Sequence, residues 1–295
     1  MTGHRAKGFS LVELMVALTL SMVITSGVAM VWVSNRQTFL GQDNRSRMQE
    51  NGRFALSVIE REVRLAGYKG LGNEGLNATY LFGTTPALSG ANDTLSVVVG
   101  GSVALTTDTL TVSFYGAGTG ATGDGTVTNC FGTGIAAGTQ VVDSFYAAVD
   151  ATSGLPSLFC SSLSGGTTTT AVLAYSIETL QVLYGEETDG AGTGIPNHFV
   201  QSGVVANFGN VTQVRVSLLV RGEDRTVAKV QGISNSQRVS GTTAPYGQTF
   251  YHFGTTYSAN DTTGDSGAAS SLVAVADGRQ RTLFTTSVAL RNRLN

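Results

Sequence analysis

The chain has 295 residues, enough for one sizeable domain or for a large domain with an appendage. Charged residues make up only 13% of it, against about 25% in ordinary domains, and the formal net charge is −2, which argues against nucleic-acid binding as its main task. With 38 Gly and only 4 Pro, and with polarity supplied by Ser, Thr, Asn and Gln, the composition favours an exported protein rich in short strands and turns.

The first residues, MTGHRAKG, form a short basic segment ahead of a long apolar run, Phe9–Val33, whose only charge is Glu13. A helix of that length spans roughly 37 Å, which is enough to cross a bilayer core. A cleaved secretory signal has a shorter apolar region, of about 7–15 residues. Arg5 and Lys7 favour a cytoplasmic N-terminus, so the pattern predicts an inner-membrane helix with the rest of the chain outside.

Glu13 is unusual in this segment, because a carboxylate at the centre of a bilayer costs on the order of 2.5–3.5 kcal/mol. It therefore needs a partner. The alternative is that Glu13 lies close enough to the membrane surface to extend its carboxylate into water.

The run from Gly8 to Ala17, GFSLVELMVA, resembles the class III signal of type IV pilins and pseudopilins. The resemblance implies a leader of residues 1–8, cut by a prepilin peptidase between Gly8 and Phe9, and methylation of the new amino group of Phe9. It also implies that Glu13 neutralises the Phe9 ammonium of a neighbouring subunit in the assembled filament, so that each buried charge is compensated.

The helix is expected to continue through residues 35–68 with a different character. Its apolar positions, spaced 7, 4, 4 and 3 apart, form one stripe: Met48, Ala55, Ile59, Val63 and Ala66. The charged residues are expected to form a solvated face, namely Arg45, Arg47, Arg53, Glu60, Arg61, Glu62 and Arg64, with Glu60 and Arg64 spaced as an i,i+4 pair. The sequence therefore predicts a membrane half, residues 9–34, and an amphipathic half, residues 35–68, that packs on a globular domain.

Residues 69–295 are expected to form a β-rich domain outside the inner membrane, periplasmic or extracellular. The predicted strands are Thr94–Val99, Leu110–Tyr115, Gln140–Tyr146, Ala171–Tyr175, Thr179–Tyr184, Val211–Val220, Gln248–Phe253 and Leu283–Leu290. Surface loops, or disordered segments, are expected at Gly116–Gly125, Ser161–Thr170, Gly185–Gly194 and Ala259–Ser271. The fold class is thus α+β, a long N-terminal helix packed on antiparallel sheet.

The two cysteines, Cys130 and Cys160, lie in this domain, and an even count in an exported protein predicts one disulfide. Closing that loop would stabilise the fold by roughly 3–4 kcal/mol in the chain-entropy model. Two unpaired buried thiols are the alternative. A zinc site is disfavoured, since two cysteines without a nearby histidine do not complete its shell.

No pattern supports an enzyme or a cofactor. The fragment Gly264–Gly267, GDSG, has the letters of a serine-protease nucleophile loop, but His198 and His252 lack that family's flanking residues. Turn formation accounts better than Ca²⁺ binding for Asp124, Asp261 and Asp265, because a loop with alternating oxygen ligands and a terminal Glu is missing.

Beyond the helix, several segments resemble minor pilins of the PilW type, from both ends and the middle of the chain. They are Gly52–Leu56, Glu62–Tyr68, Ile177–Gly185, Val214–Arg221 and Leu283–Arg293. The resemblance is thin at residues 70–170 and 222–280.

That resemblance implies a subunit that joins other minor pilins and the major pilin, starts type IV pilus assembly and lies near the pilus tip, with a PilY-type tip adhesin as a further partner. One alternative is a large J-like pseudopilin of a type II secretion system. Another is an adhesin or DNA-uptake module on a pilin scaffold, with its activity in loops at 116–170.

Overall fold

The computed structural model describes residues 10–69, 86–99, 103–190, 192–223, 249–253, 271–273 and 279–292. It divides into two compact units, Met1–Arg45 and Ser46–Asn295. Helix α1, Leu11–Leu65, contributes to both units. The predicted helix over residues 9–68 is confirmed within these bounds. Gly67 has a φ of 75°, a left-handed conformation that glycine adopts without strain and that commonly ends a helix.

Two antiparallel sheets form most of the second unit. The first contains strands in sequence order, β1 (Leu88–Val99), β2 (Val103–Tyr115), β3 (Gln140–Val149), β4 (Pro156–Ser164) and β5 (Thr167–Tyr175). The second has the order β11-β8-β6-β7, with β6 (Ile177–Glu186), β7 (His198–Val200), β8 (Val211–Arg221) and β11 (Arg281–Ala289). A separate pair is made by β9 (Thr249–Tyr251) and β10 (Ser271–Val273).

Each of the eight predicted strands overlaps an observed one, but one expected loop was wrong. Residues 161–170 are not a loop: they form the ends of β4 and β5, with Ser164 paired to Thr167 across a tight turn. The turn consists of Gly165 and Gly166, both with positive φ, which is the geometry that a two-residue hairpin requires. The Thr-rich sequence was misleading because β5 is an edge strand whose threonines are exposed and whose strand propensity is high.

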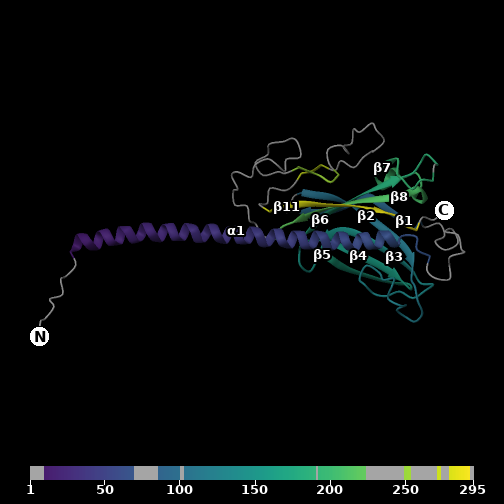
Figure 1. The fold of residues 1–295 in the computed structure, drawn as a ribbon, viewed down its shortest axis with the longest axis horizontal. Helices are drawn as coiled ribbons and strands as arrows, with labels where there is room; N and C mark the ends of the chain where they lie inside the picture. Colours follow the sequence, from purple (N-terminus) through teal and green to yellow (C-terminus); the bar gives the residue numbers. More distant parts are fainter. Residues whose placement is uncertain are drawn as a thin grey trace. The chain divides into compact units, whose positions relative to one another are not determined.

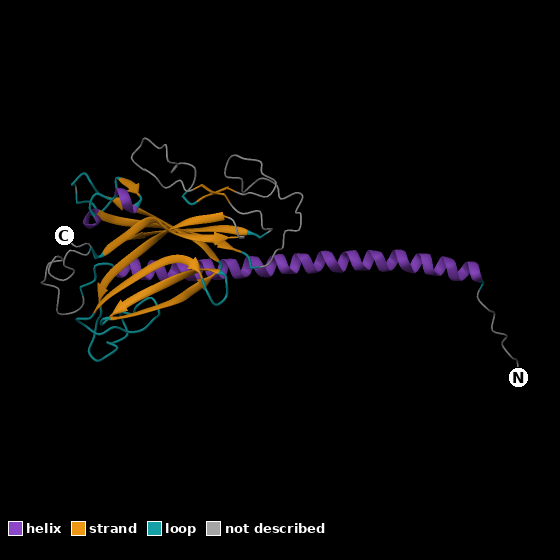
Figure 2. Cartoon of the chain, turned by 180° about the vertical axis from the view of Figure 1, so that it is seen from behind, coloured by secondary structure: helices purple, strands orange, loops and turns teal. Residues whose placement is uncertain are grey.

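The main core lies where the C-terminal part of α1 meets both sheets. The predicted stripe is confirmed, because Met48, Ala55, Ile59, Val63 and Ala66 are all buried in one cluster with residues of both sheets. In Figure 1 this part of α1 runs along the domain, with β3, β4 and β5 on one side and β11 and β6 on the other, and Figure 2 shows the same strands and helix from behind. A Cβ at Gly52 would come within 2.6 Å of the Phe284 ring, so a glycine lets α1 approach β11 closely.

Side chains of β2 join the two sheets. One edge of β6 is paired with β8, and on the opposite edge, before the short pairing with β7, the backbone is hydrogen-bonded to the side chains of Thr107 and Asp108. The Thr107 hydroxyl donates to the carbonyl of Leu180 at 3.1 Å and accepts from its amide at 3.0 Å. Asp108 accepts from the amide of Val182 at 2.8 Å. These bonds satisfy backbone groups of β6 that a neighbouring strand would otherwise satisfy.

Candidate functional site

Helix α1 begins with an N-cap that the sequence reasoning missed. The Glu13 amide donates to the Ser10 hydroxyl at 3.2 Å, and Ser10 stands immediately before the first helical residue, Leu11. Ser at the N-cap and Glu three residues later is the spacing of a capping box, and this signal is visible in the sequence. Gly8 and Phe9, the predicted cleavage and methylation sites, lie outside the described residues.

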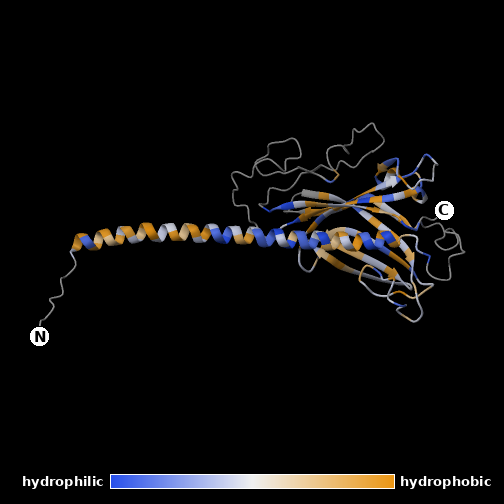
Figure 3. Cartoon of the chain, viewed as in Figure 1, coloured by the Kyte–Doolittle hydropathy of each residue, from blue (hydrophilic) through white to orange (hydrophobic). Residues whose placement is uncertain are grey.

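The membrane half of α1 presents apolar side chains on all sides. Leu11, Met22 and Met30 are each exposed by 75% or more, and the most apolar window of the helix has no buried residue. Figure 3 shows this continuous apolar character from the start of α1, followed by a more polar stretch. A helix that is apolar all round is suited to a membrane or to a bundle of similar helices. Glu13 lies on this surface near its beginning.

Four hydroxyl side chains within this half are satisfied inside the helix. Thr19, Ser21, Thr25 and Ser26 each donate to a carbonyl three or four residues earlier, at 2.7–2.9 Å. In hydrocarbon an unsatisfied hydroxyl would be costly, so these bonds let the residues face lipid or a neighbouring helix.

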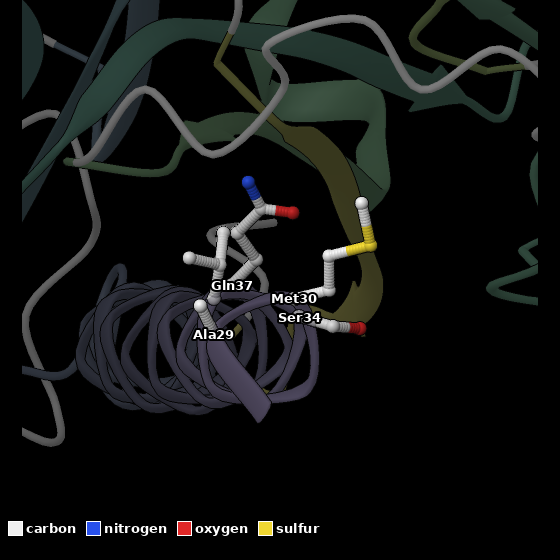
Figure 4. A pocket seen from close by; sticks show the side chains of 5 residues that line it. Ala29, Met30, Ser34 and Gln37 are labelled. Atoms are coloured by element: carbon white, nitrogen blue, oxygen red, sulfur yellow. The ribbon is translucent and has the colours of Figure 1, made fainter. Parts of the chain in front are cut away.

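The surface of α1 changes near residue 32. The Arg36 guanidinium lies 5.7 Å from the centre of the Trp32 ring, a cation–π distance. Trp residues are enriched where a helix leaves the hydrocarbon core. A shallow depression here is lined by α1 alone, and Figure 4 shows Ala29, Met30, Ser34 and Gln37 around it. It offers small and apolar side chains to whatever packs on the helix.

In the second unit, the predicted disulfide joins Cys130 to Cys160 of β4. It fixes the loop after β2 beneath α1, where the Cys130 amide donates to the Asp143 carboxylate at 2.7 Å. In the same loop the carbonyl of Asn129 accepts from the Arg61 guanidinium at 3.0 Å. Helix, loop and sheet are therefore connected at one place.

The charged face of α1 is confirmed except at Glu62, which is buried, and Glu60, which is half-buried and accepts a hydrogen bond from the Thr286 hydroxyl of β11. Glu60 and Arg64 form the expected i,i+4 ion pair, at 3.7 Å. Glu62, predicted to be solvated, is 0% exposed. It precedes Val63 of the apolar stripe and so lies at the inner edge of the helix. The exposed Arg61 beside it, whose guanidinium reaches the Glu62 carboxylate at 2.8 Å, shields it from water.

The residues considered for catalysis or metal binding have structural roles where they are described. Asp124 accepts from the amide and hydroxyl of Thr126, which is the turn role expected for it. His252 is buried between Thr179 and Ser217, at 3.0 and 2.8 Å, and burial lowers its pKa to about 3. It holds the segment after β9 against β6 and β8. Gly264–Gly267, Asp261 and Asp265 lie outside the described residues.

Asp143 also lies within 4.8 Å of both cysteine sulfurs, a grouping that resembles a metal site. The two sulfur atoms are bonded to each other in the disulfide. They consequently offer no thiolate, the form that binds zinc. His198, the other histidine of interest, lies beside Glu186 at 3.3 Å, on strand β7.

Two protein families match the chain. The family of type IV pilus-assembly protein W matches residues 144–292, half of the chain, and the prokaryotic N-terminal methylation motif matches residues 3–29. A search of curated proteins found no match. Among solved structures, a type IV-like pilin from Thermus thermophilus is similar over 84% of this chain and 98% of its own, at 13% identity and a TM-score of 0.44.

The two matched regions cover the start of helix α1 and the second half of the globular domain. The methylation motif includes the N-cap and Glu13 on the apolar helix, and the other match begins in β3 and ends beyond β11. They confirm the resemblance seen in the sequence. The chain belongs to the type IV pilus-assembly protein W family and has the helix-and-sheet fold of a minor pilin.

Proposed function

We propose that this minor pilin helps to initiate type IV pilus assembly and is incorporated at or near the pilus tip. The observation that carries the proposal is one helix with two surfaces. Its first part is apolar all round and exposed, while its last part is buried against a folded domain. A rigid domain thereby carries a helix whose surface requires lipid or other helices, which suits a subunit that leaves the membrane to join a helical bundle.

In this proposal the leader, residues 1–8, stays in the cytoplasm and residues 9–34 cross the inner membrane. The Trp32 and Arg36 pair supports a membrane boundary just beyond Val33, because aromatic and cationic side chains favour the interface. The amphipathic residues 35–68 and the β-rich residues 69–295 then lie in the periplasm, or outside the cell after assembly.

Cleavage between Gly8 and Phe9 by a prepilin peptidase would create an ammonium group next to the N-cap, Ser10. A positive charge at a helix N-terminus is unfavourable, because the helix dipole is positive there as well. The Glu13 carboxylate one turn into α1 supplies the compensating charge, to the Phe9 ammonium of a neighbouring subunit. Methylation of Phe9 keeps that charge. The partners are other minor pilins, the major pilin and a PilY-type tip adhesin.

Replacing Glu13 by Gln tests this assignment, since it removes the charge and keeps the size of the side chain. We expect the leader to be removed normally, seen as the processed form on an immunoblot, and the protein to be missing from sheared pili. The matched control is Glu50→Gln, an exposed glutamate farther along the same helix. Normal incorporation of the Glu13 variant would refute the charge pair.

A gene deletion tests the machine to which the subunit belongs. We expect loss of surface pili and twitching with normal secretion of exoproteins, and recovery when the full chain is restored. The reverse pattern would assign the chain to a secretion pseudopilus. Immunogold labelling that decorates the length of each pilus, instead of one end, would contradict the tip position.

A further inference from the structure

Helix α1 and strand β3 meet at two buried carboxyl groups. Glu62 of α1 and Asp143 of β3 are both 0% exposed. On β3 the buried residues alternate with half-buried ones, so Asp143 shares the inner face with Val141 and Phe145. Both acids therefore lie in the core between the helix and the first sheet, beside the disulfide loop.

In the contacts described, a single guanidinium, that of Arg61, offsets the negative charge of the two acids. Arg61 donates to one oxygen of Glu62, from Nε at 3.0 Å and from its terminal nitrogen at 2.8 Å, and also acts on the charge of Asp143. Asp143 accepts from the amide of Cys130 through Oδ2. Among the described residues, the other groups with contacts at this place are the Asn129 carbonyl, the disulfide and Ser162 of β4, none of which is a cation. Two ionised carboxylates would leave an excess negative charge in the core.

The remaining oxygens of the pair are weakly satisfied, because among the described residues only the Ser162 hydroxyl acts on Asp143 as a further donor and Oε2 of Glu62 has none. Ser162 lies opposite Asp143 across β3 and β4, and the contact is too long or too poorly aligned to satisfy Oδ1 of Asp143 fully. Glu186, another buried acid of this domain, differs. Glu186 accepts from the amides of Ala206 and Asn207 through Oε1, and its Oε2 lies 3.3 Å from the His198 ring, so both of its oxygens have a partner.

We propose that Glu62 and Asp143 hold one proton between them, so that the pair joins helix α1 to strand β3 while protonated and drives them apart when the proton leaves. Like charges in a low-dielectric interior repel strongly, which makes a singly protonated pair the stable state. Burial, and next the Asp143 charge, raise the pKa of Glu62 to about 8, and burial raises that of Asp143. Near neutral pH the domain then binds a proton that the unfolded chain releases.

The sign of the pH dependence follows. Because the folded pKa of Glu62 lies above its ordinary value of 4.5, the stabilisation is complete below about pH 4.5 and disappears as the pH rises through about 8. The pair of acids therefore releases helix α1 from the first sheet at alkaline pH. This happens at the place where the disulfide loop also contacts the helix.

The test uses the full chain in detergent micelles, comparing wild type with Glu62→Gln from pH 6 to pH 9.5. We expect the wild-type melting temperature to fall by at least about 5 °C more than that of the variant. The infrared band of a protonated carboxylic acid should disappear near pH 8 in wild type, and that step should be missing in Glu62→Gln. Glu50→Gln, at an exposed position, should keep the wild-type profile.

Asp143→Asn distinguishes a shared proton from a lone buried glutamic acid. Without the neighbouring charge, Glu62 ionises more easily, so the infrared step should move to lower pH. A step at the wild-type pH in this variant, or an unchanged step in Glu62→Gln, would overturn the proposal. Asp108, another acid whose pKa burial raises, to about 7, is distant in sequence, and its separate step should remain in both variants.

Discussion

The exposure of two isoleucines on helix α1 illustrates how the two units differ. Ile24 is 65% exposed and Ile59 is 0% exposed, although both belong to the continuous helix α1. The first belongs to a surface that is apolar in every direction, and the second to a stripe that the domain covers. Helix formation is common to both, so the burial of a residue here is decided by its surroundings and not by its secondary structure.

The comparison shows where the stability of each half must come from. The domain half buries its apolar side chains against its own sheets, so its stability is an intramolecular property. Over its described residues, the membrane half has hydrogen-bonded hydroxyls and an N-cap but no buried apolar side chain. Its apolar surface gains free energy only when lipid or another helix covers it.

Replacing each isoleucine by Asp should produce the largest difference between the two halves of α1. Ile59→Asp places an unpaired charge in the core, and we expect loss of folding of the domain, seen as loss of near-UV circular dichroism in detergent. Ile24→Asp should leave that signal intact and weaken membrane integration, because an acid at mid-membrane costs about 3 kcal/mol. Membrane fractionation measures the second effect. A folded Ile59→Asp domain would contradict the assignment of the core.

The disulfide should stabilise the domain half alone. Replacing Cys130 and Cys160 together by Ser is expected to lower the free energy of unfolding by roughly 3–4 kcal/mol, from the restored entropy of the open loop. Urea titration of the full chain in detergent, followed by tyrosine fluorescence, measures it. Wild type treated with a reductant should give the same value. A loss below about 1 kcal/mol would mean that the loop stays closed without the bond.

Helix α1 and the place of Glu13 near its beginning were predictable from sequence because their signals are local. An apolar run with one acid, followed by a stripe spaced at helical intervals, specifies which side of α1 is buried at Val63 and Ala66. The disulfide was predictable because only two cysteines are available. Strand positions followed from apolar runs such as Val211–Val220.

What sequence could not show depends on contacts between distant segments. Glu62 resembles its solvated neighbours in the sequence, and only the packing of α1 on β3 buries it beside Asp143. The edge strand β5 was partly missed because exposed threonines lack an apolar signal. The order of strands in the second sheet, in which β8 lies between β6 and β11, is likewise set by tertiary pairing.

A smaller effect is expected from the bonds that join the two sheets. Asp108→Ala leaves the amides of Val182 and Asp93 without their acceptor, which should lower the free energy of unfolding by about 1–3 kcal/mol. Asp150→Ala is the control, because that acid accepts hydrogen bonds in an exposed turn. Chemical denaturation of both variants measures the two losses in the free energy of unfolding. Equal losses would mean that the junction between β2 and β6 is no more important than a surface turn.

The smallest expected effect concerns the outer face of the domain half. Arg64→Ala removes the exposed ion pair with Glu60, and such i,i+4 pairs contribute about 0.3–0.5 kcal/mol. The loss should shrink further in high salt, because screening weakens exposed pairs. Thermal unfolding at low and high salt measures both values. A loss above about 2 kcal/mol that persists in salt would show that Arg64 packs against other protein groups. The division between the covered and the solvated sides of the helix would then need revision.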